Sequence, residues 1–332
     1  MQLYLAPLQG LTNRVFRGVY LRHFPFFDAA FAPFIPAVAV DRMTEKHFKD
    51  LIPDSALKIP LVPQVLGNDA PSFIATVKVL AGFGYATVNW NLGCPYSMVA
   101  KKGRGSGLLP HPDRIARILD EVCPRLQLPL SVKLRLGRHG RDEILSLMPL
   151  FNRYPLKEVI IHARLGIQMY KGEVDLDGFA LAAGLSVHPV AYNGDIVDYE
   201  AFAELRTRFP SVGVWMIGRG ALSDPFFPGR IKGLDPVVDP LGAINAFHDD
   251  LYAAYRGVLS GPGHVLDKMK EVWTYLGPSV GGAEAALAAV SRTKTFAAYE
   301  GAVRALFADG VWKPSPEPSS LASASAASAA RR

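Results

Sequence analysis

Residues 86–95 read ATVNWNLGCP, and the interpretation of the whole chain starts from this stretch. Its first five residues form a short apolar run of the β type, which leads directly into the loop sequence NLGCP. A basic, glycine-rich segment follows up to residue 109, and a helix signal appears near residue 112. The pattern predicts that Cys94 lies on a loop at the carboxyl end of a strand, where catalytic groups are often found.

The same alternation of strand and helix runs through the first two thirds of the sequence. Several of the predicted strands are continuous apolar runs, as is typical of strands covered on both faces. Eight strand–helix units in about 230 residues fit an α/β fold of the (β/α)8 TIM-barrel type. A doubly wound sheet would use fewer units and carry GxGxxG after its first strand, which this sequence lacks. The predicted strands are residues 3–7, 27–32, 60–66, 86–90, 130–134, 158–162, 189–192 and 213–217.

The pattern changes after residue 239, where helical stretches follow one another without strands between them. Helices are predicted at residues 241–260, 265–275, 283–290 and 295–307, with Gly-Pro breaks between some of them. We therefore expect a barrel domain at 1–235 and a small C-terminal helical bundle at 239–310. Residues 313–332 are rich in Pro, Ser and Ala and are expected to form a disordered tail.

Composition narrows the function classes only slightly. Lys and Arg number 36 against 30 for Asp and Glu, and a net charge of +6 is compatible with a polyanionic partner. Cys94 and Cys123 are the two cysteines, and no Cys–His spacing of a metal site appears, so no metal is expected. No signal peptide or membrane-spanning run is visible. We expect a soluble, cytoplasmic chain that acts as a monomer.

Polar residues and glycines interrupt the apolar runs where the predicted strands end, and in a barrel these ends meet on one rim. The loops after strands 7 and 8 are a recurrent phosphate cradle, in which glycines expose backbone N–H groups and an arginine adds charged donors. The interruptions are Pro7, Leu8 and Gln9, then Gln64, Asn91 to Cys94, Lys133, Arg135, His162, Arg164, Asn193 to Asp195, and Gly218 to Gly220.

Simpler interpretations compete at single positions. A lone cysteine is usually an inert buried thiol, but the NLGCP setting favours chemistry at Cys94, whereas Cys123 fits helix packing. Lys133 is hard to explain as a core residue, because a buried lysine needs a partner. Arg135 and Arg138 fit a solvated face slightly better than a site.

Seven motifs occur in an order that resembles the tRNA-dihydrouridine synthase family. The resemblance covers roughly residues 3–230, and the combination is far more specific than any one motif. HARL at residues 162–165 departs from the family's HGRT, so a glycine and a hydroxyl are missing there. The motifs are APLQGLT at 6–12, PQVLG at 63–67, NLGCP at 91–95, SVKLR at 131–135, HAR at 162–164, NGD at 193–195 and MIGRGA at 216–221.

The resemblance implies an FMN enzyme that uses NADPH, or NADH, to reduce the C5–C6 double bond of a D-loop uridine in tRNA. Cys94 would protonate C5, and the helical bundle would bind tRNA. FMN would be held by Pro7, Leu8, Gln9, Gln64, Lys133, His162, Asn193, Gly194, Asp195, Gly218 and Arg219. Asn91 and Arg164 would face the uracil, and Lys101, Lys102 and Arg104 would lie near the substrate, against tRNA phosphate or water.

Other functions remain open at this point. The nearest is an FMN-dependent dehydrogenase of a free pyrimidine or of dihydroorotate, which would share the barrel, the flavin and the acid. A flavin-free aldolase with Lys133 as its Schiff-base lysine and a non-catalytic tRNA-binding module are further alternatives.

Overall fold

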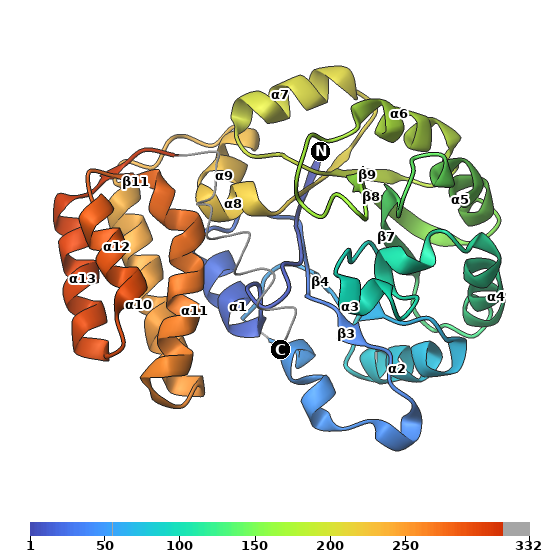
Figure 1. Ribbon diagram of the computed structural model, residues 1–332, viewed down its shortest axis with the longest axis horizontal. Coiled ribbons are helices and arrows are strands. Elements are labelled where there is room, and N and C mark those ends of the chain that lie inside the picture. Colours follow the sequence, from blue (N-terminus) through green and yellow to red (C-terminus); the bar gives the residue numbers. More distant parts are fainter. Residues whose placement is uncertain (55, 315–332) are drawn as a thin grey trace. The chain divides into compact units, whose positions relative to one another are not determined.

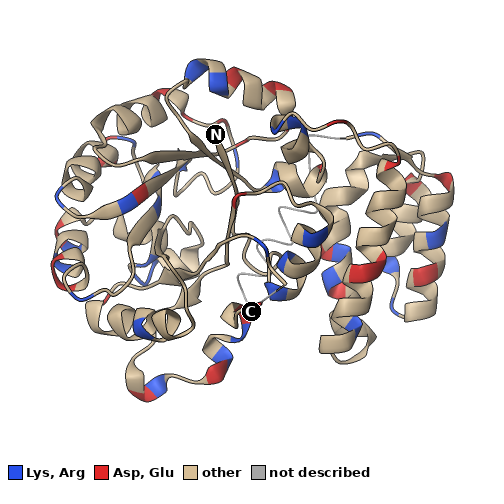
Figure 2. Cartoon of the chain, turned by 180° about the vertical axis from the view of Figure 1, so that it is seen from behind, with Lys and Arg blue, Asp and Glu red and all other residues tan. Residues whose placement is uncertain are grey.

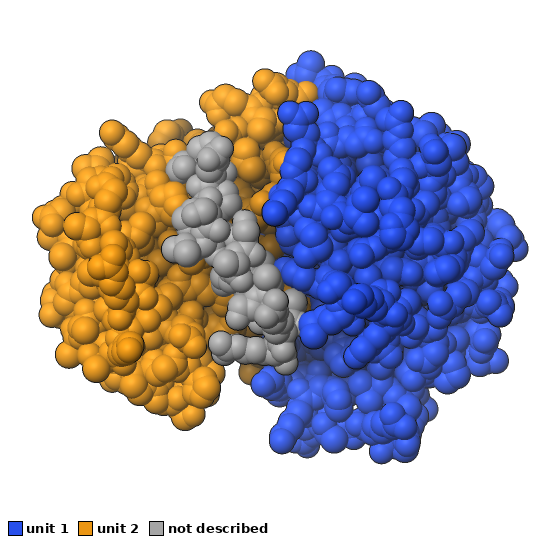
Figure 3. Space-filling view, viewed as in Figure 1, with its two compact units in different colours: residues 1–7, 28–194, 205–216 blue, residues 8–27, 195–204, 217–332 orange. Residues whose placement is uncertain are grey.

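The computed structural model describes residues 1–54 and 56–314. All but two residues of the predicted 313–332 tail therefore lie outside the described residues. The chain divides into two compact units (Figure 3), each described here by itself. The barrel unit comprises residues 1–7, 28–194 and 205–216, and the helical unit comprises 8–27, 195–204 and the described part of 217–332.

The barrel unit is built on one curled sheet (Figure 1) with the order β3-β5-β6-β7-β8-β9-β10-β1-β2-β4. β2 pairs in parallel with β4, and β3 pairs in parallel with β5. Only Pro63 separates β4 from β5, so the two ends of the order are joined and the sheet closes. The strands are β1 (Gln2–Leu5), β2 (Ala29–Phe31), β3 (Ile35–Pro36), β4 (Leu61–Val62), β5 (Gln64–Leu66), β6 (Val88–Leu92), β7 (Leu130–Gly137), β8 (Leu156–Leu165), β9 (Val190–Asn193) and β10 (Val214–Ile217).

Counting β2 with β3 and β4 with β5 gives the eight strands of a TIM barrel, which confirms the predicted fold class. Two details differ from the prediction. The strand expected at 60–66 is interrupted at Pro63, which has no N–H for a ladder bond. β8 extends to Leu165 and so includes Arg164, which had been placed beyond the strand.

Helices follow the strands and surround the sheet, as Figure 1 shows. Side-chain caps fix where several begin: Asp69 accepts from the Ser72 N–H, and Asp175 accepts from the Gly178 N–H. α2 turns Phe73, Val77 and Leu80 inward. These helices are α2 (Ala70–Gly82), α3 (Ser97–Ala100), α4 (Pro112–Val122), α5 (Glu143–Phe151), α6 (Leu176–Leu185) and α7 (Tyr199–Arg208), with 3-10 turns at Val40–Arg42, Glu45–His47, Lys49–Leu51 and Gly105–Leu108.

An apolar layer fills the middle of the barrel. It consists of Tyr4, Ala6, Ala29, Phe31, Val62, Ile160, Ala191 and Met216, all buried. Alternate residues of a strand share a face, so the side chains two positions further along each strand also point inward, nearer the carboxyl edge. The apolar layer therefore forms the floor beneath the polar residues of that edge.

The helical unit packs helix on helix. α1 (Arg14–His23) lies against α10 (Pro240–Val258). Phe16 and Tyr20 of α1, with Phe24 directly after it, surround the ring of Phe247 at centroid distances of 5.3 to 6.0 Å. Figure 2 shows basic and acidic residues interspersed along the C-terminal helices. The remaining elements are α8 (Arg219–Ser223), α9 (Phe227–Ile231), α11 (Gly261–Leu276), α12 (Glu284–Arg292), α13 (Phe296–Asp309), the 3-10 turn Gly277–Ser279, and a two-stranded ribbon of β11 (Val280–Gly281) and β12 (Val311–Trp312).

Candidate active site

The strand register brings the predicted polar residues of the barrel unit together. His162 follows Ile160 by two positions on β8, and Asn193 follows Ala191 by two on β9, so both rise from the apolar floor. His162 is paired with Asn193 on one side and with Arg135 on the other. Asn91 is paired with Lys133 in the same way. Adjacent strands thus place one polar side chain beside the next at the carboxyl edge.

Side-chain amides link three strands at this edge. Gln64 Nε2 donates to Asn89 Oδ1 at 2.7 Å, and Asn89 Nδ2 donates to Ser131 Oγ at 2.8 Å. Asn91 Nδ2 donates to Gln64 Oε1 at 2.6 Å. All four side chains are buried, and each bond offsets the cost of taking a polar group out of water. Asn89 and Ser131 were not among the predicted site residues, although Asn89 shares the inward parity of Asn91.

The loop that carries Cys94 is held by hydrogen bonds to its backbone. Asn91 Oδ1 accepts from the Cys94 N–H at 2.8 Å and from the Gly93 N–H at 3.1 Å. Cys94 O accepts from both the backbone N–H and the hydroxyl of Ser106, each at 3.0 Å. Cys94 is only 6% exposed. The cysteine lies on a loop at the carboxyl end of β6, as predicted, and there it occupies a fixed, enclosed place.

The glycines of the 103–107 segment permit close packing on this loop. Gly105 has φ of +54°, and a Cβ there would lie 2.7 Å from Cys94 O. A Cβ on Gly107 would lie 2.2 Å from Ala100 O. Both contacts are too short for any side chain, so these positions require glycine. Their role is to let the segment fold over Cys94.

Two arginines complete the support of the Cys94 loop. Arg135 donates from Nε to Gly93 O at 3.1 Å and from Nη1 to Leu165 O at 2.8 Å. Arg138 Nη1 donates to Pro95 O at 2.9 Å and to Ser106 Oγ at 3.1 Å. Arg135 is 2% exposed, so its interpretation as a solvated residue is wrong. Three of the four partners are backbone carbonyls far away in the sequence, which no sequence pattern reveals.

Burial decides the charge state of the Cys94 thiol. It raises the pKa of Cys94 to about 11, against the opposing effects of a hydrogen bond from the Tyr96 backbone and of the positive charges of Arg135 and Arg138. The sulfur is therefore a protonated thiol at neutral pH. Such a group can donate a proton, whereas nucleophilic attack would need the thiolate.

Lys133 is a cation held in a poorly solvated place. Its Nζ donates to Asn193 Oδ1 at 2.8 Å, and Asn193 Nδ2 donates to Met216 O at 2.9 Å. Burial, reinforced by the charge of Arg135, lowers the pKa of Lys133 to about 7. An anionic group placed beside this amine would stabilise its charged form.

His162 and Arg164 lie on the inner side of β8. Arg164 donates from Nε and Nη2 to Gly172 O, at 3.2 and 2.6 Å, and its Nη1 lies 3.4 Å from His162 Nε2. Both side chains are buried, and the ring of Tyr170 lies 6.2 Å from that of His162. The Arg164 guanidinium thus also anchors the segment after β8.

The helical unit holds Leu8, Gln9, Asp195, Gly218 and Arg219 of the predicted cofactor residues, whereas Pro7 and Gly194 belong to the barrel unit. Arg219 Nη2 donates to Asp195 Oδ1 at 2.8 Å, which joins the loops after β9 and β10. A Cβ on Gly220 would lie 2.3 Å from Ile196 O, so the two loops pack backbone to backbone. Leu8 N donates to Thr12 Oγ1 at 2.9 Å. Gln9 Oε1 is buried and has no hydrogen-bond partner among the described residues.

The basic segment after Cys94 divides into two parts. Lys101 and Lys102 are exposed, whereas Arg104 is half-buried and donates from Nε to Asn68 Oδ1 at 3.2 Å. Asn68 in turn donates to Lys102 O at 2.9 Å, so this turn is tied to the loop after β5. Over the described residues, no group of three His, Cys, Asp or Glu side chains could hold a metal ion, and no helix is long and apolar enough to cross a membrane.

Known proteins can be compared with this arrangement. A probable tRNA-dihydrouridine synthase of Rhodobacter capsulatus is 28% identical over 263 residues, covering 77% of this chain and 79% of the relative. One of Staphylococcus aureus is 31% identical over 228 residues, covering 67% of this chain and 69% of the relative. Among solved structures, the old yellow enzyme homologue of Zymomonas mobilis superimposes with a TM-score of 0.50 at 10% identity, over 71% of this chain and 90% of its own. This last likeness shows the fold alone.

A family model decides the assignment. The model described as dihydrouridine synthase matches residues 4–237, which include all of the closed sheet except the first two residues of β1, and the loop that carries Cys94. The match extends over more than half of the chain and agrees with the motifs at the strand ends. The chain belongs to the dihydrouridine synthase family.

Proposed function

We propose that this protein reduces the C5–C6 double bond of a uridine in tRNA to give dihydrouridine, with Cys94 as the proton donor. Membership of the dihydrouridine synthase family makes it a flavin-dependent oxidoreductase acting on tRNA uridine. The observation that carries the assignment of Cys94 is its burial as a neutral thiol, fixed by Asn91, Ser106 and two arginines at the carboxyl edge of the barrel.

The residues fit a flavin, which we propose to be FMN. The buried acceptor Gln9 Oε1 lacks a partner among the described residues, as expected for a group that receives a hydrogen bond from a ligand. Burial disfavours the charged form of the Lys133 amine, and an anionic ring atom of the cofactor would stabilise that form. Pro7, Leu8, Gln64, His162, Asn193, Gly194, Asp195, Gly218 and Arg219 complete the proposed cofactor set, with NADPH or NADH as the reductant. When bound, the flavin supplies the hydride that reaches C6 of the uracil.

Cys94 would then deliver a proton to C5 from Sγ. Arg135 and Arg138 stabilise the thiolate that remains, because both charges lower the pKa of this thiol. Their hydrogen bonds to Gly93 O and Pro95 O keep the sulfur in place while Cys94 changes from thiol to thiolate. Asn91 and Arg164 are proposed to face the uracil.

The target uridine must leave the base stack to enter such an enclosed site. We propose that residues 239–310 bind tRNA and that Lys101, Lys102 and Arg104 contact its phosphates. Such contacts would make binding salt-dependent without selecting a sequence.

A comparison of substrates tests this function against an FMN-dependent dehydrogenase of free pyrimidines. Purified protein is supplied with NADPH and either unmodified tRNA or free uridine, and dihydrouridine is quantified in each. We expect product from tRNA and none from free uridine. Equal turnover of both, or turnover of the free base alone, would overturn the proposal.

A further inference from the structure

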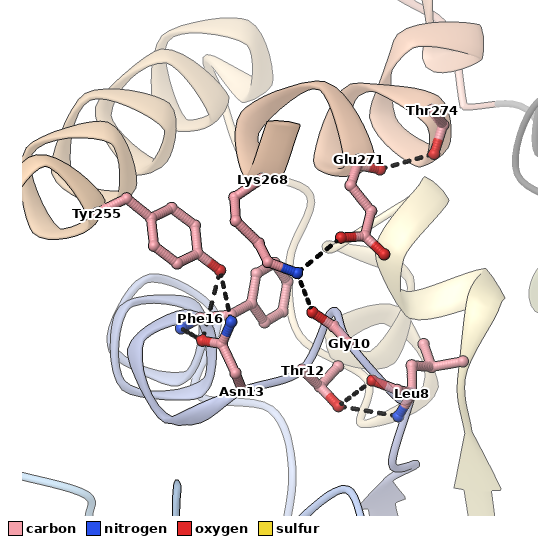
Figure 4. A network of polar contacts seen from close by, with 9 residues as sticks. All are labelled: Leu8, Gly10, Thr12, Asn13, Phe16, Tyr255, Lys268, Glu271 and Thr274. Carbon is pink, nitrogen blue, oxygen red and sulfur yellow. Dashed lines mark hydrogen bonds and ion pairs between the residues drawn. The ribbon is translucent and has the colours of Figure 1, made fainter. Parts of the chain in front are cut away.

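The loop between β1 and α1 is tied to the C-terminal helices by side chains of the helical unit (Figure 4). This loop, residues 8–13, carries Leu8 and Gln9 of the proposed flavin site. Within it, Leu11 N and Thr12 N both donate to Leu8 O, at 3.1 and 3.0 Å. Gly10 sits at φ of +86°, in the left-handed region that favours glycine. The turn is tight, so a change in the orientation of one of its peptide groups would shift the residues beside it.

Lys268 of α11 fixes one of these peptides. Its Nζ donates to Gly10 O and to Glu271 Oε2, the latter at 3.0 Å. The side chain of Lys268 is 27% exposed and that of Glu271 is 11% exposed, so the ion pair is shielded from bulk water. The ammonium is oriented by a carboxylate on its own helix and donates to the carbonyl of Gly10, the residue after Gln9.

A second contact holds the far end of the same loop. Tyr255 of α10 accepts at its hydroxyl from Asn13 Nδ2 at 3.1 Å. Asn13 Oδ1 caps α1 by accepting from the Phe16 N–H at 3.0 Å. Residues 8–13 are therefore held at two points by helices that lie more than two hundred residues later in the sequence.

We propose that Lys268 is a positioning residue of the flavin site, and that α11 is thereby part of the machinery that holds the cofactor. This inference rests on the proposed function. The lysine contacts Gly10 O and so fixes the peptide that joins Gly10 to Leu11. We infer that this holds the turn in which Gln9 lies, and with it the Gln9 side chain, whose buried Oε1 has no hydrogen-bond partner among the described residues. Its charge also faces the carbonyl end of the peptide dipole, which neutral side chains would hold less firmly.

The test compares two lysines of α11. Lys268→Met removes the contact to Gly10, and Lys270→Met removes a contact of the same kind, from Nζ to Thr293 O, which lies away from the loop. FMN affinity is measured by the quenching of flavin fluorescence. We expect at least a tenfold loss of affinity in Lys268→Met, a change below twofold in Lys270→Met, and substantial recovery in Lys268→Arg. Equal affinities for both methionine variants would overturn the inference.

A readout without cofactor separates this inference from the proposed function. Amide hydrogen exchange in the flavin-free protein should become faster at residues 9–12 in Lys268→Met, while the strands β6 to β8 keep their protection. Unchanged exchange in the loop would overturn the positioning role. If the wild type binds no FMN, the proposed function fails, whereas the exchange result still decides whether Lys268 orders the loop. Lys268→Gln, which keeps a donor, replaces the methionine variant if that variant does not fold.

Discussion

Strand β8 carries Glu158 and His162 on one face, with Ile160 between them. The charged side chains near these two residues differ: Asp28 and Lys157 lie near Glu158, whereas those near His162 are cations. At the amino end, Glu158 accepts from the Tyr4 hydroxyl at 3.2 Å, and Asp28 accepts from the Leu3 N–H. At the carboxyl end, the charged side chains are Lys133, Arg135 and Arg164.

The difference separates a structural end from a chemical one. Burial raises the pKa of Glu158, against the opposing effects of the hydrogen bond from Tyr4 and of the positive charge of Lys157. The carboxyl end instead accumulates cations whose burial is costly unless an anion arrives. A closed sheet thus offers two polar rims, and it is the carboxyl rim that we propose receives an anionic ligand.

Removing the Cys94 thiol should give the largest loss of dihydrouridine formation. A matched change at the amino end of the barrel should give no such loss. Cys94→Ala is expected to lower dihydrouridine formation by about 10²- to 10⁴-fold, the usual contribution of a positioned acid. Flavin content and its reduction by NADPH should stay at wild-type values, as measured by absorbance. Glu158→Gln at the amino end is the matched control and should leave turnover unchanged. Normal turnover by Cys94→Ala would refute the assignment of the proton donor.

Loss of the buried amine should be the next largest effect. Lys133→Met is expected to purify with little flavin, because the cation that we propose faces the cofactor is gone. Lys157→Met, which removes a lysine bonded to Thr87 Oγ1 at 2.8 Å, should retain full flavin occupancy. The ratio of flavin absorbance to protein absorbance measures both. A Lys133→Met variant with full flavin occupancy would contradict the proposed contact.

The packing over Cys94 can be broken without touching a polar group. Gly105→Ala forces a side chain into a left-handed backbone and against Cys94 O, and should lower the free energy of unfolding by about 1–3 kcal/mol. Gly140→Ala is the control, since nothing lies within 4 Å of its Cβ position. Denaturant unfolding of the two variants measures the difference. Equal stabilities would show that the segment yields without cost.

The two ends should also respond to pH with opposite signs. In the flavin-free protein, the pKa of Lys133 is lowered from 10.5 to about 7, so the unfolded chain binds the extra proton and stability rises with pH across that window, by up to about 1.4 kcal/mol per unit. The pKa of Glu158 is raised, so the folded state holds the extra proton and stability falls as pH rises above 4.5. When the free energy of unfolding is plotted against pH, Lys133→Met should lose the rise above pH 7. Glu158→Gln should lose the fall above pH 4.5. A rise between pH 7 and 10 that persists in Lys133→Met would point to another group.

The barrel was predictable because its signal is local. Apolar runs alternate with helices, and polar residues mark the strand ends, so Cys94, Lys133 and His162 could be placed on one edge from the sequence. The supports of the site could not be placed in this way. Arg135 and Arg138 contact backbone carbonyls 30 or more residues away, and Lys268 contacts one 258 residues away. A carbonyl carries no residue signature, so its partner is found only when the chain has been folded.

The packing of α1 on α10 also has a consequence for synthesis on the ribosome. α1 ends at His23, and its partner begins at Pro240. At about 5–20 residues per second, α1 waits roughly 10 to 40 seconds for that partner to be made. During this time the aromatic face formed by Phe16, Tyr20 and Phe24 has nothing from α10 to cover it. The nascent chain therefore exposes the aromatic face of this helix until about three quarters of the chain have been made. This makes the helix a natural site for a chaperone to bind.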